Sequence, residues 1–175
     1  ALIKARAICE AAGVATIADD SGLCVEALGG APGVYSARYC GRHGDDEANN
    51  DKLLRELRGA PEGKRAAAFE SAVCLYLPGG AHILFAGRCP GRILFERKGR
   101  NGFGYDPLFA PDHVGDAGGG LLPNAAGRSY AELADAEKDA VSHRGAALRE
   151  LQKKLPAFLQ RVQPGAGVGF ERDEK

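Results

Sequence analysis

The sequence predicts an α/β or α+β domain built around a mixed β-sheet. Strand-like and helix-like segments alternate along the 175 residues, and 45% of the residues are hydrophobic, enough for a sizeable core. Two β-prone runs, 69–77 and 83–88, flank a loop that contains Pro78-Gly79-Gly80 and predict a hairpin. The sequence contains no long-period repeat of the kind that would indicate a solenoid or a propeller.

The first segment has the spacing of a short amphipathic helix. Apolar residues recur at intervals of three and four over residues 1–12, and Gly13 is suited to end the helix in a left-handed turn. The chain contains no methionine and begins inside this helix without a capping residue. We therefore expect that upstream sequence is missing.

Two extended segments follow, with two carboxylates between them. Residues 14–18 predict a strand that ends at Asp19-Asp20, and residues 23–28 alternate as a second extended segment. Further on, Asp45 is a suitable N-cap for a surface helix, and residues 91–96 predict one more strand.

The C-terminal half combines a glycine-rich stretch with helices. Residues 115–128 have no hydrophobic period and predict a flexible insertion without a fixed element. Ser129 and Glu132 form a capping box that predicts the start of a helix. A longer helix is predicted by an apolar stripe that Pro156 should kink or split. The members of the stripe are Leu148, Leu151, Leu155, Phe158 and Val162.

Charge and cysteine usage exclude several classes of protein. Basic and acidic residues number 23 each, so the sequence carries no electrostatic signature for nucleic acid or an anionic membrane. The five cysteines are odd in number and form no C-x-x-C, which disfavours both a disulfide framework and a zinc site. No apolar run approaches the ~20 residues needed to span a bilayer. We expect a cytoplasmic protein.

The adjacent carboxylates Asp19 and Asp20 are the first candidate site. Successive side chains of an extended segment point to opposite faces, so one carboxylate should face a site while the other supports it. With Ser21 and Gly22 behind them, they form a setting in which oxygen atoms could hold Mg²⁺ together with several waters. The alternative is an ordinary solvated turn, because D-D-S-G is also typical turn composition.

Two further clusters carry potential binding groups. Phe103, Gly104, Tyr105 and Asp106 place two aromatic rings and a carboxylate around a glycine, which could stack a base and bind its edge. The alternative is a loop whose aromatic rings fill the core. Lys138, His143 and Arg144 lie near Ser142, a possible helix cap, and could bind an anion or a keto oxygen. Here the alternative is a solvated, charged helix face.

These motifs together resemble a known family. The segments LIKA, IADDSGL, ALGGAPGVYSARY, GFGYDPLF and EKDAVSHRG occur in an order and at separations similar to those of the inosine triphosphate pyrophosphatases, over about residues 1–155. Members of that family hydrolyse deaminated purine nucleoside triphosphates to the monophosphate and pyrophosphate, and they require Mg²⁺. The resemblance implies an elongated α/β fold with a long mixed sheet flanked by helices, two lobes with a nucleotide cleft between them, and a homodimer.

The resemblance and the composition of the C-terminal tail together predict a division of the chain. A single domain would cover residues 1–162 but lack the N-terminal strand and phosphate-gripping loop of the family, and a disordered tail would cover residues 163–175. Because that loop is absent, a catalytically impaired nucleotide-binding remnant of the same family stays open as the alternative function.

Individual roles follow from the resemblance. It implies that Asp20 is the catalytic carboxylate, which activates water or holds the metal, with Asp19 beside it and Ser21 touching the substrate. Lys4 matches a lysine near the phosphates. The remaining substrate-binding positions are matched by Phe103, Gly104, Tyr105, Asp106, Lys138, His143 and Arg144. We expect Asp20, Tyr105 and Arg144 to line a single crevice that holds one nucleotide.

Overall fold

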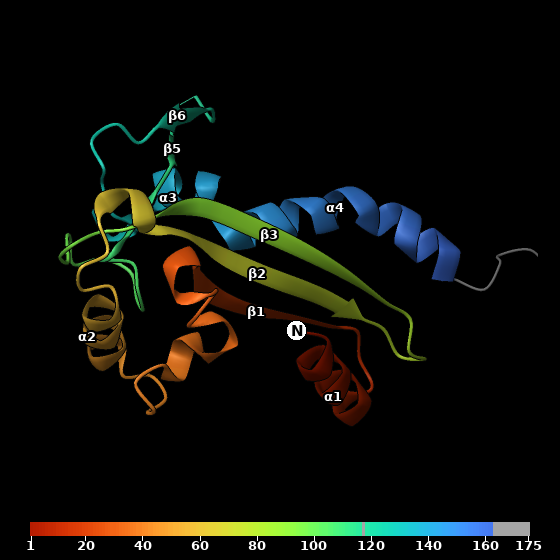
Figure 1. Cartoon of the computed structure of the whole chain (residues 1–175). Coiled ribbons are helices and arrows are strands. Elements are labelled where there is room, and N and C mark those ends of the chain that lie inside the picture. The colour runs from red at the N-terminus through yellow and green to blue at the C-terminus, as the bar shows by residue number, and fades with distance from the viewer. Residues whose placement is uncertain (117, 163–175) are drawn as a thin grey trace, which may run out of the picture.

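The computed structural model describes residues 1–116 and 118–162 as a four-stranded sheet with helices on both faces (Figure 1). The order of the strands is β1-β2-β3-β4, with bounds Thr16–Val25, Ala66–Tyr76, His82–Ile93 and Phe109–Pro111. The predicted α/β architecture with flanking helices is confirmed. All pairings in this sheet are antiparallel, whereas the expectation was a mixed sheet. The short loop 77–81 permits only an antiparallel pairing of β2 with β3.

β1 is one continuous strand that contains Asp19 and Asp20 near its middle. It pairs with β2 along its whole length, from Thr16 opposite Tyr76 to Val25 opposite Ala67. The prediction of two extended segments separated at the carboxylates is wrong. The hydrogen-bond ladder to a long neighbour outweighs the turn-like composition of D-D-S-G, because strand formation depends on pairing more than on local preference.

Helix α1, Leu2–Ala12, lies on one face of the sheet. As predicted, Gly13 ends it in the left-handed conformation, at φ 70°, and donates its N–H to the carbonyl of Cys9 at 2.8 Å. Buried Ala5 and Cys9 of the helix pack against Cys74 and Tyr76 of β2.

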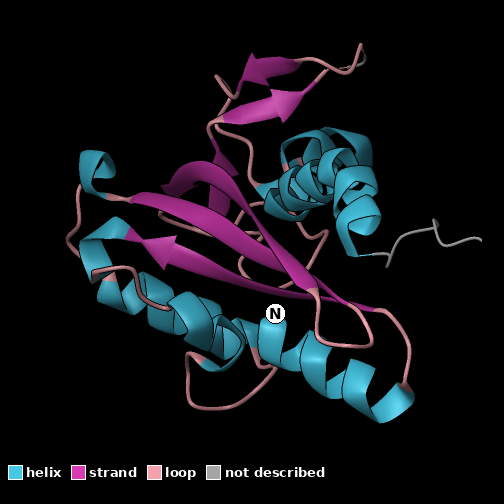
Figure 2. Ribbon diagram, turned by 90° about the vertical axis from the view of Figure 1, so that its right-hand side faces the viewer, coloured by secondary structure: helices cyan, strands magenta, loops and turns pink. Residues whose placement is uncertain are grey.

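Helix α4, His143–Val162, lies on the opposite face (Figure 2). Its buried Leu151 and Phe158 pack against Val73 and Leu75 of β2. Pro156, expected to kink or split this helix, does not split it, and α4 runs continuously through this residue. Leu148, predicted in the apolar stripe, is instead 48% exposed. No helix in the described part of the chain is both long enough and apolar enough to cross a membrane.

Helix α2, Asp46–Glu56, begins as predicted at Asp45, whose side chain accepts a hydrogen bond from the N–H of Ala48 at 3.0 Å. It covers the main core, where Leu53 and Leu57 pack with residues of β1, β2 and the segment after β3. Three short 3-10 helices lie between β1 and β2, at Glu26–Leu28, Gly33–Arg38 and Glu62–Lys64.

The hairpin β2–β3 is confirmed and is longer than predicted. The separate strand predicted over residues 91–96 does not exist: residues 91–93 are the end of β3, and residues 94–96 lie outside any strand. Hairpin pairing across the whole of β2 holds the glycine-containing segment around Gly87 and Gly91 in one strand.

The glycine-rich stretch contains a fixed element, contrary to expectation. β6, Leu121–Pro123, pairs with β5, His113–Gly115. Glu132 accepts a hydrogen bond from the N–H of Ser129 at 2.8 Å, but the turn it opens is a 3-10 helix over Tyr130–Glu132. The following helix, α3, covers Asp135–Val141. The predicted tail, 163–175, lies outside the described residues.

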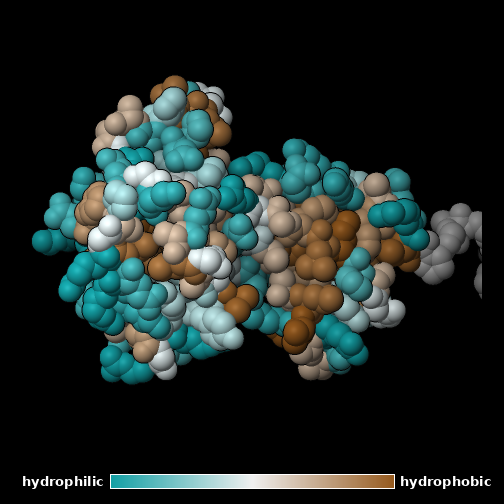
Figure 3. Space-filling model, in the orientation of Figure 1, coloured by the Kyte–Doolittle hydropathy of each residue, from teal (hydrophilic) through white to brown (hydrophobic). Residues whose placement is uncertain are grey.

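Apolar residues gather on the surface over the α1 end of the sheet (Figure 3). Ile3 and Ile8 of α1 are 84% and 54% exposed, and Leu84 of β3 is 46% exposed. Charged and polar side chains dominate the other end of the same view (Figure 3).

Candidate nucleotide-binding site

A cavity of about 500 Å³ brings together most of the predicted binding residues. β1, the 3-10 helix Gly33–Arg38, the loop after β3, α3 and the start of α4 all contribute to its wall. The predicted residues that line it are Ser21, Phe103, Gly104, Tyr105, Asp106, Lys138, His143 and Arg144. Segments more than 100 residues apart in the chain therefore converge at one place.

Phe69 and His143 line this cavity and belong to an aromatic stack. The rings of Phe69 and His143 are parallel to within 12°, with their centroids 5.0 Å apart, and Tyr130 stacks on Phe69 at 5.7 Å. Burial, together with the positive charges of Arg144 and Lys138, lowers the pKa of His143 to about 4. The imidazole is therefore neutral at pH 7. Its buried Nδ1 has no hydrogen-bond partner among the described residues.

The loop of Phe103 to Asp106 is held by its own carboxylate and by a lysine. Asp106, 3% exposed, accepts hydrogen bonds from the N–H of Phe103 at 3.0 Å and from Nζ of Lys138 at 2.6 Å. The Phe103 ring is 63% exposed, and Nζ of Lys138 and Cζ of Arg144 lie 5.2 and 5.7 Å from its centroid. This arrangement offers an aromatic surface flanked by hydrogen-bond donors.

The two adjacent carboxylates have partners on opposite faces of β1. Asp19 Oδ2 lies 2.6 Å from Nε of Arg144, on the α4 face. Asp20 Oδ1 lies 2.6 Å from Nζ of Lys4, on the α1 face. Partial burial would raise the pKa of Asp19, but the hydrogen bond and charge of Arg144 outweigh it, so the pKa lies below its ordinary value.

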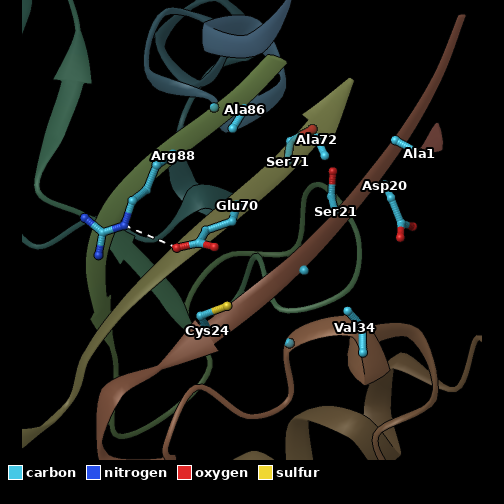
Figure 4. Close-up of a pocket in the computed structure, with 13 residues that line it drawn as sticks. Ala1, Asp20, Ser21, Cys24, Val34, Glu70, Ser71, Ala72, Ala86 and Arg88 are labelled. Atoms are coloured by element: carbon cyan, nitrogen blue, oxygen red, sulfur yellow. Dashed lines mark ion pairs between the residues drawn. The ribbon is translucent and has the colours of Figure 1, made fainter. Parts of the chain in front are cut away.

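Asp20 lies in a second cavity, of about 490 Å³, rather than in the first one (Figure 4). Lys4 does not line it, but Ala1 at the start of the chain does. The two cavities share Ser21 and Gly22 of β1. Tyr105 and Arg144 line the first cavity together, as expected. Asp20 does not join them, because it lines the second cavity, on the other face of β1. The alternation of side chains along an extended backbone imposes this separation.

This geometry disfavours one Mg²⁺ held jointly by Asp19 and Asp20, because their carboxylates pair with cations on opposite faces of β1. Within residues 1–116 and 118–162, no three His, Cys, Asp or Glu side chains form a ready-made cage. A single carboxylate that faces an open cavity still fits Mg²⁺, which keeps several waters and shares substrate phosphates as ligands. Of the two carboxylates, Asp20 has this setting.

Several residues of the site were not predicted. Phe69, Asp46 and Ser36 line the first cavity. The hydroxyl of Tyr105 donates a hydrogen bond to the carbonyl of Ser36 at 2.9 Å. Ser36 lies inside the segment ALGGAPGVYSARY, so its motif offered a signal. No sequence signal placed Asp46 or Phe69 in the site, because Asp46 reads only as the start of a helix and Phe69 only as an apolar position in a strand.

The fold and the cavities define a class of protein, an α/β protein with a cleft whose aromatic and cationic lining is suited to a nucleotide. The family model described as the Ham1 family matches residues 1–154. The chain belongs to the Ham1 family.

Relatives and solved structures agree with this membership. The chain is 53% identical over 160 residues to a dITP/XTP pyrophosphatase of Mycolicibacterium paratuberculosis, covering 91% of this chain and 72% of the relative. It is 52% identical over 156 residues to a dITP/XTP pyrophosphatase of Corynebacterium glutamicum, covering 89% of this chain and 71% of the relative. 

The fold is similar to that of a nucleoside-triphosphatase / dITP/XTP pyrophosphatase from Mycobacterium abscessus, with a TM-score of 0.70, 49% identity, and coverage of 86% of this chain and 73% of that one. It is also similar to the Ham1 protein of Staphylococcus aureus, with a TM-score of 0.77, 37% identity, and coverage of 90% and 74%.

Proposed function

We propose that the protein hydrolyses deaminated purine nucleoside triphosphates, dITP, XTP and ITP, to the monophosphate and pyrophosphate, and so removes them from the nucleotide pool. One observation carries the proposal: two adjoining cavities share Ser21 and Gly22, one with aromatic and cationic groups and the other with the Asp20 carboxylate. A nucleotide that crosses β1 at these two residues would reach both. The names of the relatives favour this reaction over the alternative of an inactive binding remnant.

The base would lie in the cavity of His143 and Arg144. Hypoxanthine and xanthine carry an acceptor oxygen at C6, and adenine carries an amino donor there. Arg144 donates Nε to Asp19, and its other guanidinium nitrogens have no hydrogen bond among the described residues. With adenine, donors aimed at C6 would be left unpaired, at a cost of about 1–3 kcal/mol each.

The phosphates would lie in the cavity of Asp20. In the proposed reaction the Asp20 carboxylate orients a water, accepts its proton and directs attack in line on the α-phosphorus. Lys4, 2.6 Å from Asp20, would turn its ammonium toward the phosphates when substrate displaces the ion pair. Mg²⁺, held by Asp20 and the phosphates, would neutralise the triphosphate charge.

Pyrophosphate release from dITP, ITP, XTP and ATP with Mg²⁺ tests the proposal. We expect the deaminated nucleotides to exceed ATP in kcat/KM by about tenfold to a hundredfold, as expected for one or two unpaired donors. Equal rates for ITP and ATP would contradict the assignment of the base cavity.

A pair of carboxylate variants tests the phosphate cavity. Asp20→Asn should lower kcat by about 10²–10⁴, the range for loss of a general base. Glu10 of α1 is half-exposed, in an ion pair with Arg6 at 2.7 Å, and lines neither cavity, so Glu10→Gln is the matched control and should keep wild-type turnover. Full activity of Asp20→Asn would remove Asp20 from the reaction.

The expectations of a cytoplasmic location and a homodimer remain part of the proposal. All five cysteines are free, which agrees with a reducing compartment. Analytical ultracentrifugation at micromolar concentration tests the dimer, and a monomer at all concentrations would contradict it.

A further inference from the structure

Helix α2 binds both backbone polar groups of Gly104, its N–H and its carbonyl. Asp46 Oδ2 accepts a hydrogen bond from the N–H of Gly104 at 2.7 Å, and Asn50 Nδ2 donates to the carbonyl of Gly104 at 2.8 Å. Asp46 and Asn50 are four residues apart, so they lie on the same face of the helix. The contact joins residues that are 54 and 58 positions apart in sequence.

Asn50 is built into this position. It is 1% exposed, and its Nδ2 also donates to the carbonyl of Asp46 at 2.9 Å, which fixes the amide along the helix. Its Oδ1 is buried without a partner among the described residues, a cost that a core position would avoid with an apolar side chain. An apolar side chain, however, could not form the hydrogen bond to the carbonyl of Gly104.

The position of Gly104 decides where Phe103 points. Gly104 is left-handed, at φ 59°, and joins the exposed Phe103 ring to the buried Tyr105. Asp106 and Lys138 hold the far side of the loop, but they contact neither the N–H nor the carbonyl of Gly104. Apart from these two bonds from α2, neither the N–H nor the carbonyl of Gly104 has a hydrogen bond among the described residues.

We propose that Asn50, with Asp46, is a positioning residue that sets the Phe103 ring over the base cavity through the Gly104 peptide. Asp46 itself lines the cavity, whereas Asn50 does not and acts only through Gly104. This inference rests on the proposed function for the identity of the ligand, a purine nucleotide.

The test compares Asn50→Leu with Asn49→Leu. Asn49 is the matched control, because it is 2% exposed on the same helix and accepts one backbone hydrogen bond, from the N–H of Cys40 at 2.7 Å, without touching the loop. We expect Asn50→Leu to weaken inosine monophosphate binding and to raise KM for dITP about tenfold, with kcat nearly unchanged, since base binding is shared by ground and transition states. Asn49→Leu should leave both values at wild type.

A double-variant cycle with Phe103→Ala separates positioning from general loss of stability. If Asn50 acts through the Phe103 ring, Asn50→Leu adds no further loss of nucleotide affinity in the Phe103→Ala background. Asn50→Ala serves in the same cycle if Asn50→Leu does not fold, as judged by thermal unfolding. Multiplicative losses, or equal effects of Asn50→Leu and Asn49→Leu, overturn the proposal.

Calorimetry with inosine monophosphate keeps this result distinct from the proposed reaction. If the wild type binds the monophosphate but releases no pyrophosphate from dITP, the proposed reaction is contradicted. The role of Asn50 can then still be tested, because the double-variant cycle can be measured with monophosphate affinity alone. A wild type that binds no inosine monophosphate overturns both.

Discussion

Asp19 and Asp20 are consecutive residues of one strand, yet each forms its ion pair on a different face of the sheet, with Arg144 of α4 and with Lys4 of α1. The strand thereby lies between two cavities, and under the proposed function the two carboxylates would have separable roles. One orients a cation beside the base cavity, and the other faces the cavity assigned to the phosphates.

Asp19→Asn should weaken nucleotide binding without the collapse of kcat expected for Asp20→Asn. The change removes the negative charge that pairs with the Arg144 guanidinium and weakens its orientation, so KM for dITP should rise while kcat stays near wild type. Steady-state kinetics of the two variants side by side checks this. A shared loss of kcat would mean that the two carboxylates act as one unit.

The same ion pair predicts a small acid-dependent term in stability. Because the folded-state pKa of Asp19 is depressed, its contribution is present above the ordinary value of 3.8 and is lost as the pH falls through the folded-state pKa. Both side chains are more than 40% exposed, so the contribution should stay below about 1 kcal/mol. Urea unfolding of wild type and Asp19→Asn should differ at pH 6 and converge once the pH falls below the folded-state pKa of Asp19. A constant difference would contradict the assignment.

His143 predicts a second pH dependence, in a different window. Its pKa is lowered to about 4 in the folded protein from 6.5, so the unfolded chain binds the extra proton between these values. Stability should therefore fall as the pH is lowered from about 6.5 to 4, by an amount on the order of 3 kcal/mol. His143→Phe keeps a ring against Phe69 but cannot titrate. Its free energy of unfolding should lack this fall between pH 6.5 and 4.5, and parallel curves would refute the prediction.

A side chain added at Gly87 should disturb the cavity of His143 and Arg144 by steric collision. A Cβ at this position of β3 would collide with the carbonyl oxygen of His143 and lie 2.6 Å from the N–H nitrogen of Ala147. Gly87→Ala should push the start of α4 away from the sheet, lower stability by about 1–3 kcal/mol and weaken nucleotide binding. Gly63, with nothing within 4 Å of an added Cβ, provides the control Gly63→Ala. Wild-type affinity of Gly87→Ala would show that α4 can shift without moving Arg144.

The buried pair of Asp106 and Lys138 should be sensitive to the loss of either partner. Lys138→Met leaves a carboxylate that is 4% exposed beside the Phe103 loop without its cation, at a cost of about 3–5 kcal/mol. The double change with Asp106→Asn removes the charge as well and should recover part of that loss in thermal unfolding. If the double variant is less stable than Lys138→Met, the pair is not the source of the effect.

Local patterns were sufficient where a local rule decides the structure. The 3-4 spacing before Gly13, the N-cap Asp45 and the hairpin around Pro78-Gly79-Gly80 all predict elements that the structure contains. Such features depend on backbone geometry and on nearest neighbours along the chain. The motif segments likewise pointed to the loop of Phe103 and to Arg144 as parts of one cavity.

By itself, then, the sequence determined the class of the fold, the helices with clear caps, the hairpin and the motif segments of the site. Tertiary structure decided that β1 continues through Asp19 and Asp20, because a ladder with β2 supplies hydrogen bonds that no local pattern encodes. It also decided that the two carboxylates serve different cavities, that β6 pairs with β5, and that Asn50 reaches Gly104. These outcomes depend on pairing and contact between segments distant in the chain, and only the folded arrangement brings those segments together.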